Sequence, residues 1–494
     1  MRLHRWRRPV LAATVVMALL AGSVPANAET AGTIQGERSR LLTYMITDPV
    51  LVNNPAKVTE VLKRDGDLDA LGLKPDTDDV DRSSKRTAAT EDPGYIVDSA
   101  EFDRGAKPVN PYRYIEYPEC RANDDAARTI GWIKNRFSYC QKFLFPISYY
   151  DVTTGITSTA TIQNTIIGYG KIGPYPGVAT RRFADFRFTA EVLEPNGIFL
   201  DPRSEMEIAV KCAGEYRGDI GLDDSRACYP NPGLERHDKS FIGWGLDPKA
   251  HYELFSEGQA PSPQYGEQIA QGVFHFEYDF DFPGPNSDPT KKSAEGGLRF
   301  DSADYTWDKQ GSVFDRAVPG IGYSKSDPKV ARHAKFVDES RANPAASWSP
   351  KPGKRLLGGS PLHADSLHRV ARAKGHDIVL DRNRATARAA CGRPGMPAPL
   401  PEEGPDFDCD EYAYAATYEG AAGWRDPGGV FDPNKYRDDF AVRYVNRQHN
   451  SEAGNRLNSF YQTHRLLDVD RLIPPWNQVL DPNDQERFWV PITP

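Results

Sequence analysis

Residues 274–282 read FHFEYDFDF, an unbroken alternation of aromatic and polar side chains. A period of two is typical of a β-strand with one buried face, because successive side chains point to opposite sides of a sheet. Looser alternation occurs at 183–192 and on both sides of the turn signal Thr154-Gly155. We therefore predict an all-β, sandwich-like or barrel-like domain over residues 111–335. Its aromatic face could bind a ligand, but packing in a core is the simpler explanation.

The beginning of the chain has the features of a secretory signal peptide. Residues 1–28 contain four arginines near the start and end on the cleavage motif Ala26-Asn27-Ala28. The apolar run between them, at 10–21, is too short to span a bilayer, and no later segment approaches eighteen apolar residues. We expect a secreted, extracellular protein.

Six cysteines fit an oxidising compartment. They allow fifteen connectivities, of which pairing between sequence neighbours is the simplest. No Cys-x-x-Cys spacing is present, so a zinc site is not expected. The neighbouring couples are Cys120 with Cys140, Cys212 with Cys228, and Cys391 with Cys409.

The charge balance excludes a protein that is basic throughout. The chain has 61 Lys+Arg against 69 Asp+Glu, a net charge of −8, and loses four of its arginines with the signal peptide. Residues 341–494 differ from the rest, because their 16 Arg and 4 Lys balance 20 acidic residues. The acidity therefore belongs to the preceding part, and a local nucleic-acid site in the neutral, Arg-rich part stays possible.

The composition changes along the chain suggest further segments. We expect residues 29–110 to be poorly structured, apart from a short helix at 57–63 and an acidic linker at 76–93. A second linker is predicted at 336–350, followed by an α+β domain over 351–494. In that domain the predicted elements are a helix at 360–374, a strand at 376–381, a strand at 440–445 and a helix at 451–466.

The densest group of possible catalytic side chains is Asp406, Asp408, Asp410 and Glu411, four carboxylates within six residues. Such carboxylates repel each other unless a cation neutralises them, and hard oxygen ligands suit Mg²⁺, Mn²⁺ or Ca²⁺. Crowding also raises carboxyl pKa values toward the range that a general base needs. The alternative is a solvated acidic turn held by a disulfide from Cys409.

A second group follows at the start of the predicted C-terminal helix. Asn455 can ligate a hard cation through its amide oxygen, and Arg456 can grip a phosphate through two N–H groups. An ordinary polar helix start is the alternative interpretation.

Residues 408–420, DCDEYAYAATYEG, resemble the central motif of the secreted NucA/NucB-type deoxyribonucleases, in which Asp-Glu-aromatic-Pro is followed by Glu-Gly. The predicted change from helix to strand at 373–381 also matches that family. So do three later motifs, in the same order: Asn446-Arg447, 454–457 (GNRL) and 465–468 (RLLD). The resemblance covers roughly residues 345–480. One departure is Ala413, which stands where the family has Pro and removes a backbone constraint but no catalytic group.

The resemblance implies a ββα-metal nuclease fold that cuts DNA with little sequence preference, using one divalent metal such as Mg²⁺ or Mn²⁺. It maps the acidic catalytic residue to Asp410, with Glu411 beside it, and the metal-binding helix residue to Asn455. Arg456 is the candidate for steadying phosphate charge. Glu419 matches the Glu-Gly pair and is either catalytic or a structural partner of arginines.

Three further side chains are weaker candidates. His376 and His449 could assist catalysis. Asp408 could contact and orient the catalytic residues, or belong only to the turn.

Two other functions stay open at this stage. Asp410 could pair with a distant carboxylate in a glycosidase. Alternatively, the chain is a secreted binding or surface protein whose β domain attaches to a cell-wall or matrix ligand, with a decayed hydrolase domain. The short Asp-Glu cluster with Asn-Arg on a helix favours phosphate chemistry, so we expect DNA as the substrate.

Overall fold

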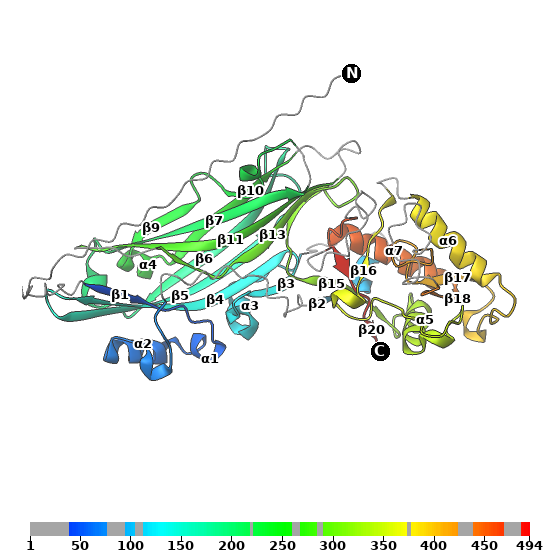
Figure 1. Ribbon diagram of the computed structural model, residues 1–494, viewed down its shortest axis with the longest axis horizontal. Helices are drawn as coiled ribbons and strands as arrows, with labels where there is room; N and C mark the ends of the chain where they lie inside the picture. The colour runs from blue at the N-terminus through cyan, green and yellow to red at the C-terminus, as the bar shows by residue number, and fades with distance from the viewer. Residues whose placement is uncertain are drawn as a thin grey trace, which may run out of the picture. The chain divides into compact units, whose positions relative to one another are not determined.

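Strand β11 (Gln268–Asp281) contains the alternating aromatic stretch and lies inside one of two large antiparallel sheets (Figure 1). Its Phe274, Phe276 and Tyr278 are buried, whereas the polar residues between them are partly exposed. The sheet has the order β14-β13-β11-β7-β9, with β12 attached to β11. Its other strands are β7 (Glu205–Arg217), β9 (Arg236–Ser240), β12 (Lys291–Lys292), β13 (Gly296–Ser302) and β14 (Gln310–Phe314).

The second large sheet has the order β1-β4-β5-β6-β10-β8, with β3 paired to β4. Strands β4 and β5 are joined at Gly155, whose φ of 66° suits glycine, so the predicted turn is confirmed. The strands are β1 (Arg40–Thr43), β3 (Trp132–Asn135), β4 (Ser138–Asp151), β5 (Ile156–Gly170), β6 (Arg181–Leu193), β8 (Tyr229–Pro230) and β10 (Lys249–Glu257).

Aromatic side chains from the two sheets meet in one core. Phe145 on β4 stacks on Tyr278, with ring centroids 5.0 Å apart. Phe186 and Phe188 on β6 contact the rings of Phe274 and Phe276 at 4.9 and 5.0 Å. The aromatic stretch therefore serves as core, and the prediction of a mostly β fold with antiparallel sheets is confirmed.

The structure, a computed structural model, describes residues 39–76, 94–103, 112–217, 221–258, 267–283, 290–372, 377–422, 438–468 and 486–494. The predicted signal peptide and most of the predicted acidic linker lie outside these ranges. Residues 39–494 belong to one compact unit.

Residues 39–76 are ordered, unlike the prediction for 29–110. Helix α2 (Pro55–Asp65) confirms the short helix and follows α1 (Pro49–Val52). Leu62 of α2 packs with Tyr44 in an apolar cluster that includes Leu144 of β4. Burial of this one apolar face orders a segment whose composition is otherwise polar.

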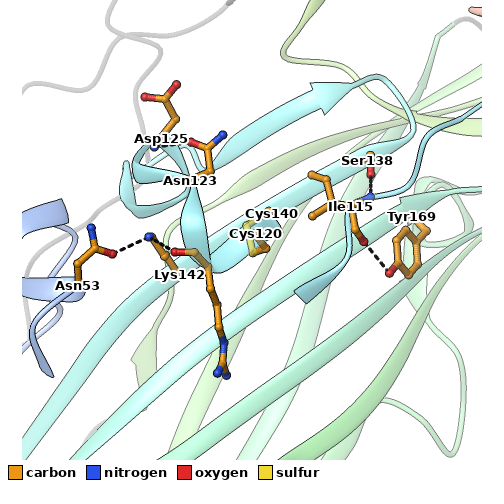
Figure 2. Close-up of a disulfide and its surroundings, with 10 residues drawn as sticks. Asn53, Ile115, Cys120, Asn123, Asp125, Ser138, Cys140, Lys142 and Tyr169 are labelled. Atoms are coloured by element: carbon orange, nitrogen blue, oxygen red, sulfur yellow. Dashed lines mark hydrogen bonds between the residues drawn. A yellow bond between two sulfur atoms is a disulfide. The ribbon is translucent and has the colours of Figure 1, made fainter. Parts of the chain in front are cut away.

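The Cys120–Cys140 disulfide attaches helix α3 (Tyr117–Ala122) to strand β4 (Figure 2). Beside it, Lys142 donates to the Asn53 side chain and to the Arg121 carbonyl, both at 2.7 Å, so it also connects the N-terminal helices to the sheet. Burial lowers the pKa of Lys142. Tyr169 donates to the Ile115 carbonyl at 3.0 Å, which completes the attachment of this segment.

The other two disulfides also join sequence neighbours, as predicted. Cys212–Cys228 connects β7 to the segment that leads into β8. Cys391–Cys409 connects the end of helix α6 (Asp377–Cys391) to strand β17 (Phe407–Tyr412). Three disulfides are compatible with an extracellular protein. Across the described ranges, no helix is long and apolar enough to cross a membrane.

The C-terminal part differs from the prediction in its first elements. Residues 360–374 contain a 3-10 turn, η7 (His363–Asp365), and a short strand, β16 (Leu367–His368), which pairs with β19 (Arg487–Phe488). The strand predicted at 376–381 is wrong, because residues 377–381 begin helix α6. The rest of helix α6 is rich in Ala and Arg, which favour helix. The helix buries Leu380, Asn383 and Ala387 on one face.

The last predicted elements are confirmed. Strand β18 (Ala441–Asn446) pairs antiparallel with β17, and helix α7 (Arg447–Thr463) begins directly after it. The linker predicted at 336–350 instead contains the end of helix α5 (Ala331–Ala342) and the turn η6 (Pro344–Ala346). Strand β15 (Val318–Ser324) runs parallel to β2 (Gly94–Asp98) and β20 (Ile492–Thr493), and packs in the same core as α5 and α7.

A buried ionic cluster connects the β-sheets to the segments after α7. Asp301 of β13 bonds the guanidinium groups of Arg299 and Arg465, and Glu486 bonds Arg299 and accepts from the Leu467 N–H at 2.9 Å. These four charged side chains are at most 4% exposed. Although burial alone would raise the pKa of Asp301, the guanidinium groups of Arg465 and Arg299 hold it below its ordinary value.

Removing one partner of this cluster should be strongly destabilising. We expect Asp301→Asn to lower the free energy of unfolding by about 3–5 kcal/mol, because buried Arg465 loses its counter-charge and buried Arg299 keeps only Glu486. Chemical denaturation measures this loss. The matched control is Glu194→Gln in the exposed Lys63–Glu194 pair (2.9 Å), which should cost under about 1 kcal/mol. Equal effects would contradict a structural role for the cluster.

Candidate functional site

A pocket of about 1020 Å³ lies where strand β17, helices α5, α6 and α7, and the β13–β14 connection meet. Asp410, Glu411 and Asn455 all line it. Three of the side chains predicted to act together are therefore brought together by the fold. The β-sheet part contributes Asp304, Tyr305 and Thr306 to the wall, so both large parts of the chain build this pocket.

Two hydrogen bonds fix the side chain of Asp410 in the wall of this pocket. It lies on β17, one residue after the disulfide-bonded Cys409, and is 3% exposed. Its Oδ2 is 2.8 Å from Nδ1 of His333, and its Oδ1 accepts from the Glu411 N–H at 2.8 Å. Each oxygen of a carboxylate has two lone pairs, so each keeps one for a further ligand.

Glu411 has a different environment although it is the next residue. Burial raises its pKa to about 7, and the nearby charge of Asp410 adds to the increase. Arg384 and Arg388 partly offset both effects. A carboxyl group that titrates near neutrality can accept a proton at physiological pH, as a general base must. Two neighbouring carboxyl groups with different environments are a common arrangement at catalytic sites.

Asn455 lies on the face of α7 that borders the pocket. Asn450, Ser451, Gly454 and Asn458 share this face, as expected for positions three to five residues apart on a helix. The sequence interpretation missed Asn450 and Asn458, which the helical period could have identified. Among the described residues the Asn455 amide has no hydrogen-bond partner, so its oxygen can reach a ligand.

Arg456 occupies a different position from the one predicted. It is 1% exposed and is bound by Asp327 at 2.5 Å, by Glu452 at 3.1 Å and by Asp103. It does not line the pocket, because its side chain is directed toward these three carboxylates. Its role is to attach α7 to neighbouring segments, and the prediction that it steadies phosphate is wrong.

Glu419 is also a structural residue. It is buried and its two carboxylate oxygens bond the backbone N–H and Nδ1 of His368, at 2.9 and 2.8 Å. It does not line the pocket. Of the two roles left open for Glu419, the structure supports the structural one, with His368 as one of its partners.

The weaker candidates have separate positions. Asp408 is exposed and lines the pocket at its edge. His449 accepts from the Arg332 N–H at 3.3 Å, and burial lowers its pKa, but it does not line the pocket. His376 lies outside the described residues.

Four arginines that the sequence interpretation did not single out line the pocket. Arg384 and Arg388 lie one turn apart on the exposed side of α6, and Arg372 is exposed near the start of that helix. Arg369 is buried, 4.6 Å from the centre of the Tyr305 ring and 5.0 Å from that of Tyr461. The sequence interpretation did not identify Arg384 and Arg388, because it placed a strand at 376–381 and no helix after it.

The donor set suits a hard cation bound with few protein ligands. Among the described residues, no three His, Cys, Asp or Glu side chains are grouped to hold a metal ion. Mg²⁺ commonly needs only one or two carboxylates and retains water or takes substrate phosphate oxygens. Asp410, with the amide oxygen of Asn455, fits that requirement, and Glu411 lines the same pocket on the side of α6. The same residues do not fit a closed zinc site, which needs four protein ligands.

Comparisons with protein-family models, curated proteins and solved structures find no match to this chain.

The pKa of Glu411 predicts an unusual stability profile. Because its pKa rises from 4.5 in the unfolded chain to about 7 in the folded one, the folded protein binds the proton more tightly, and stability falls as the pH increases between these values. We therefore expect Glu411→Gln to stabilise the protein by roughly 1–3 kcal/mol at pH 8 and hardly at all at pH 4. Denaturation at both pH values tests this, with exposed Glu60→Gln as the control. A pH-independent effect would contradict the assignment.

Proposed function

We propose that this chain is a secreted, metal-dependent endonuclease that hydrolyses phosphodiester bonds of extracellular DNA. The main support is the convergence of Asp410, Glu411 and Asn455 on one arginine-lined pocket. The resemblance of residues 408–420 to the NucA/NucB motif adds to it. The antiparallel β17–β18 pair followed at once by α7 is compatible with the ββα-metal nuclease type that the resemblance implies.

Asp410 and Glu411 have different proposed roles. Asp410 is immobilised by His333 and by a backbone N–H, which suits a residue that binds and orients. Glu411 is less buried than Asp410, and its pKa is raised to about 7, which suits the group that takes a proton from the attacking water. We therefore assign the base to Glu411 and the binding role to Asp410.

Asp410 and Asn455 would hold a divalent cation, Mg²⁺ or Mn²⁺, with Glu411 close by. The cation supplies stabilisation of the negative charge that develops on the phosphate. Glu411 can serve as base only when it is deprotonated, so activity should increase with pH up to about 7.

Arg384 and Arg388 replace Arg456 as the candidates for binding phosphate. Their exposed position and one-turn spacing let both guanidinium groups reach a nucleic-acid strand at the pocket. Contacts to phosphate carry no sequence information, so this arrangement supports cleavage with little sequence preference. The β-sheet part builds one wall of the pocket through Tyr305 and its neighbours, and it could also bind a cell-wall or matrix ligand.

Substitution of the pocket residues should abolish cleavage of plasmid DNA. We expect Asp410→Ala, Glu411→Gln and Asn455→Ala each to lower kcat at least 100-fold with Mg²⁺, and EDTA to stop the wild-type protein. Gel assays of purified, folded variants measure this. The matched control is Asp406→Asn, an exposed residue of the same segment that does not line the pocket and should retain activity. Full activity of Asp410→Ala, or of the wild type in EDTA, would overturn the proposal.

The arginine pair should determine how salt affects DNA binding. In EDTA, which prevents cleavage, we expect the double variant Arg384→Ala/Arg388→Ala to bind a DNA duplex more weakly and to reduce the slope of log K against log salt by up to about 2. Fluorescence anisotropy measures both quantities. Arg393→Ala, exposed and outside the pocket, is the control. An unchanged slope in the double variant would exclude phosphate contacts by this pair.

A further inference from the structure

His333 joins the candidate site from outside the part of the chain that resembles a nuclease. It lies on helix α5, 77 residues before Asp410, and is 1% exposed. Both nitrogens of its ring are bonded: Nδ1 to the Asp410 carboxylate at 2.8 Å, and Nε2 to the Tyr414 hydroxyl at 3.2 Å. Its ring also stacks on that of Tyr414 and lies edge-on to Tyr323.

One tautomer satisfies both hydrogen bonds. If Nδ1 carries the proton, it donates to Asp410, and the Tyr414 hydroxyl donates to the bare Nε2. An ionised carboxylate can only accept, so this direction is the one that a metal-binding Asp410 requires. The stacked tyrosine ring prevents the imidazole from turning, and the imidazole in turn prevents the carboxylate from turning.

We propose that His333 is a positioning residue that acts through Asp410: its Nδ1–H fixes one carboxylate oxygen, so that the remaining lone pairs point into the pocket. This inference rests on the proposed nuclease function. Neighbours that orient a metal-binding side chain typically change affinity or activity 10-fold to 100-fold when they are replaced. A histidine that only filled space in the core would not show this dependence on one particular ring nitrogen.

Two polar substitutions of similar size separate these roles. The amide nitrogen of Asn lies close to the position of Nδ1, so His333→Asn keeps a donor for Asp410 and loses the bond to Tyr414. The longer Gln places its amide near Nε2, so His333→Gln keeps the bond to Tyr414 and loses that to Asp410. We expect His333→Asn to retain kcat within about fivefold, and His333→Gln to lower kcat 10-fold to 100-fold with KM for DNA unchanged.

The experiment measures kcat and KM on plasmid DNA with saturating Mg²⁺, and thermal unfolding of both variants. His449→Gln is the control, because that histidine is near α5 but outside the pocket. Activity of His333→Gln equal to or above that of His333→Asn overturns the inference, while inactive Asp410→Ala still supports the nuclease. Full activity of Asp410→Ala overturns the proposed function itself.

A measurement without any His333 variant covers the case in which neither variant folds. A hydrogen-bonded imidazole N–H gives a downfield proton resonance in the NMR spectrum. We expect the Asp410→Ala spectrum to lose one such signal, that of His333, and to keep the one expected from the buried His368–Glu419 pair. Retention of every downfield imidazole signal in Asp410→Ala would overturn the inference.

Discussion

The buried cluster around Asp301 is the constraint on which the rest of the structure depends. Asp301 and Arg299 belong to a central β-strand, whereas Arg465 and Glu486 belong to segments beyond helix α7. Each of these charged groups is buried and no longer hydrated, so its charge is compensated only by the other members of the cluster. Separating the two parts of the chain would therefore cost a large free energy. The same attachment places the β13–β14 connection, with Tyr305, at the pocket. The β-sheets therefore form one wall of the candidate site and do more than carry it.

The pocket itself illustrates how two adjacent carboxyl groups acquire different properties. In strand β17 successive side chains point in opposite directions, so Asp410 faces α5 and its histidine, and Glu411 faces the arginines of α6. The Cys391–Cys409 disulfide holds that strand against α6 immediately beside both residues. Burial without a close hydrogen-bonded cation leaves Glu411 with a raised pKa, and this is the property that a base near neutrality requires.

Several expectations from sequence failed for a common physical reason. Arg456 and Glu419 stand inside a family-like motif, yet both are buried and bind structural partners. Arg456 pairs with Asp327 and Asp103, and Glu419 bonds the backbone and ring of His368. A short window was also misleading: residues 376–381 were expected to form a strand, but residues 377–381 belong to helix α6, whose following Ala-Arg segment favours helix. Arg384 and Arg388 became candidates only when that helix placed them on the pocket.

By itself the sequence determined the local features: the alternating aromatic strands, helix α7 and the Asp410-Glu411 pair with Asn455. It favoured disulfides between sequence neighbours without excluding the other pairings. The local features depend on side-chain period and on short spacing, which a single chain displays directly. Tertiary structure alone decided which polar groups meet. Neither the bond from His333 to Asp410 nor the Asp301 cluster has a local signature, because each joins residues at least 77 positions apart through packing of separate elements. Catalytic candidates are therefore recognisable from the motif, but their partners are set by the fold.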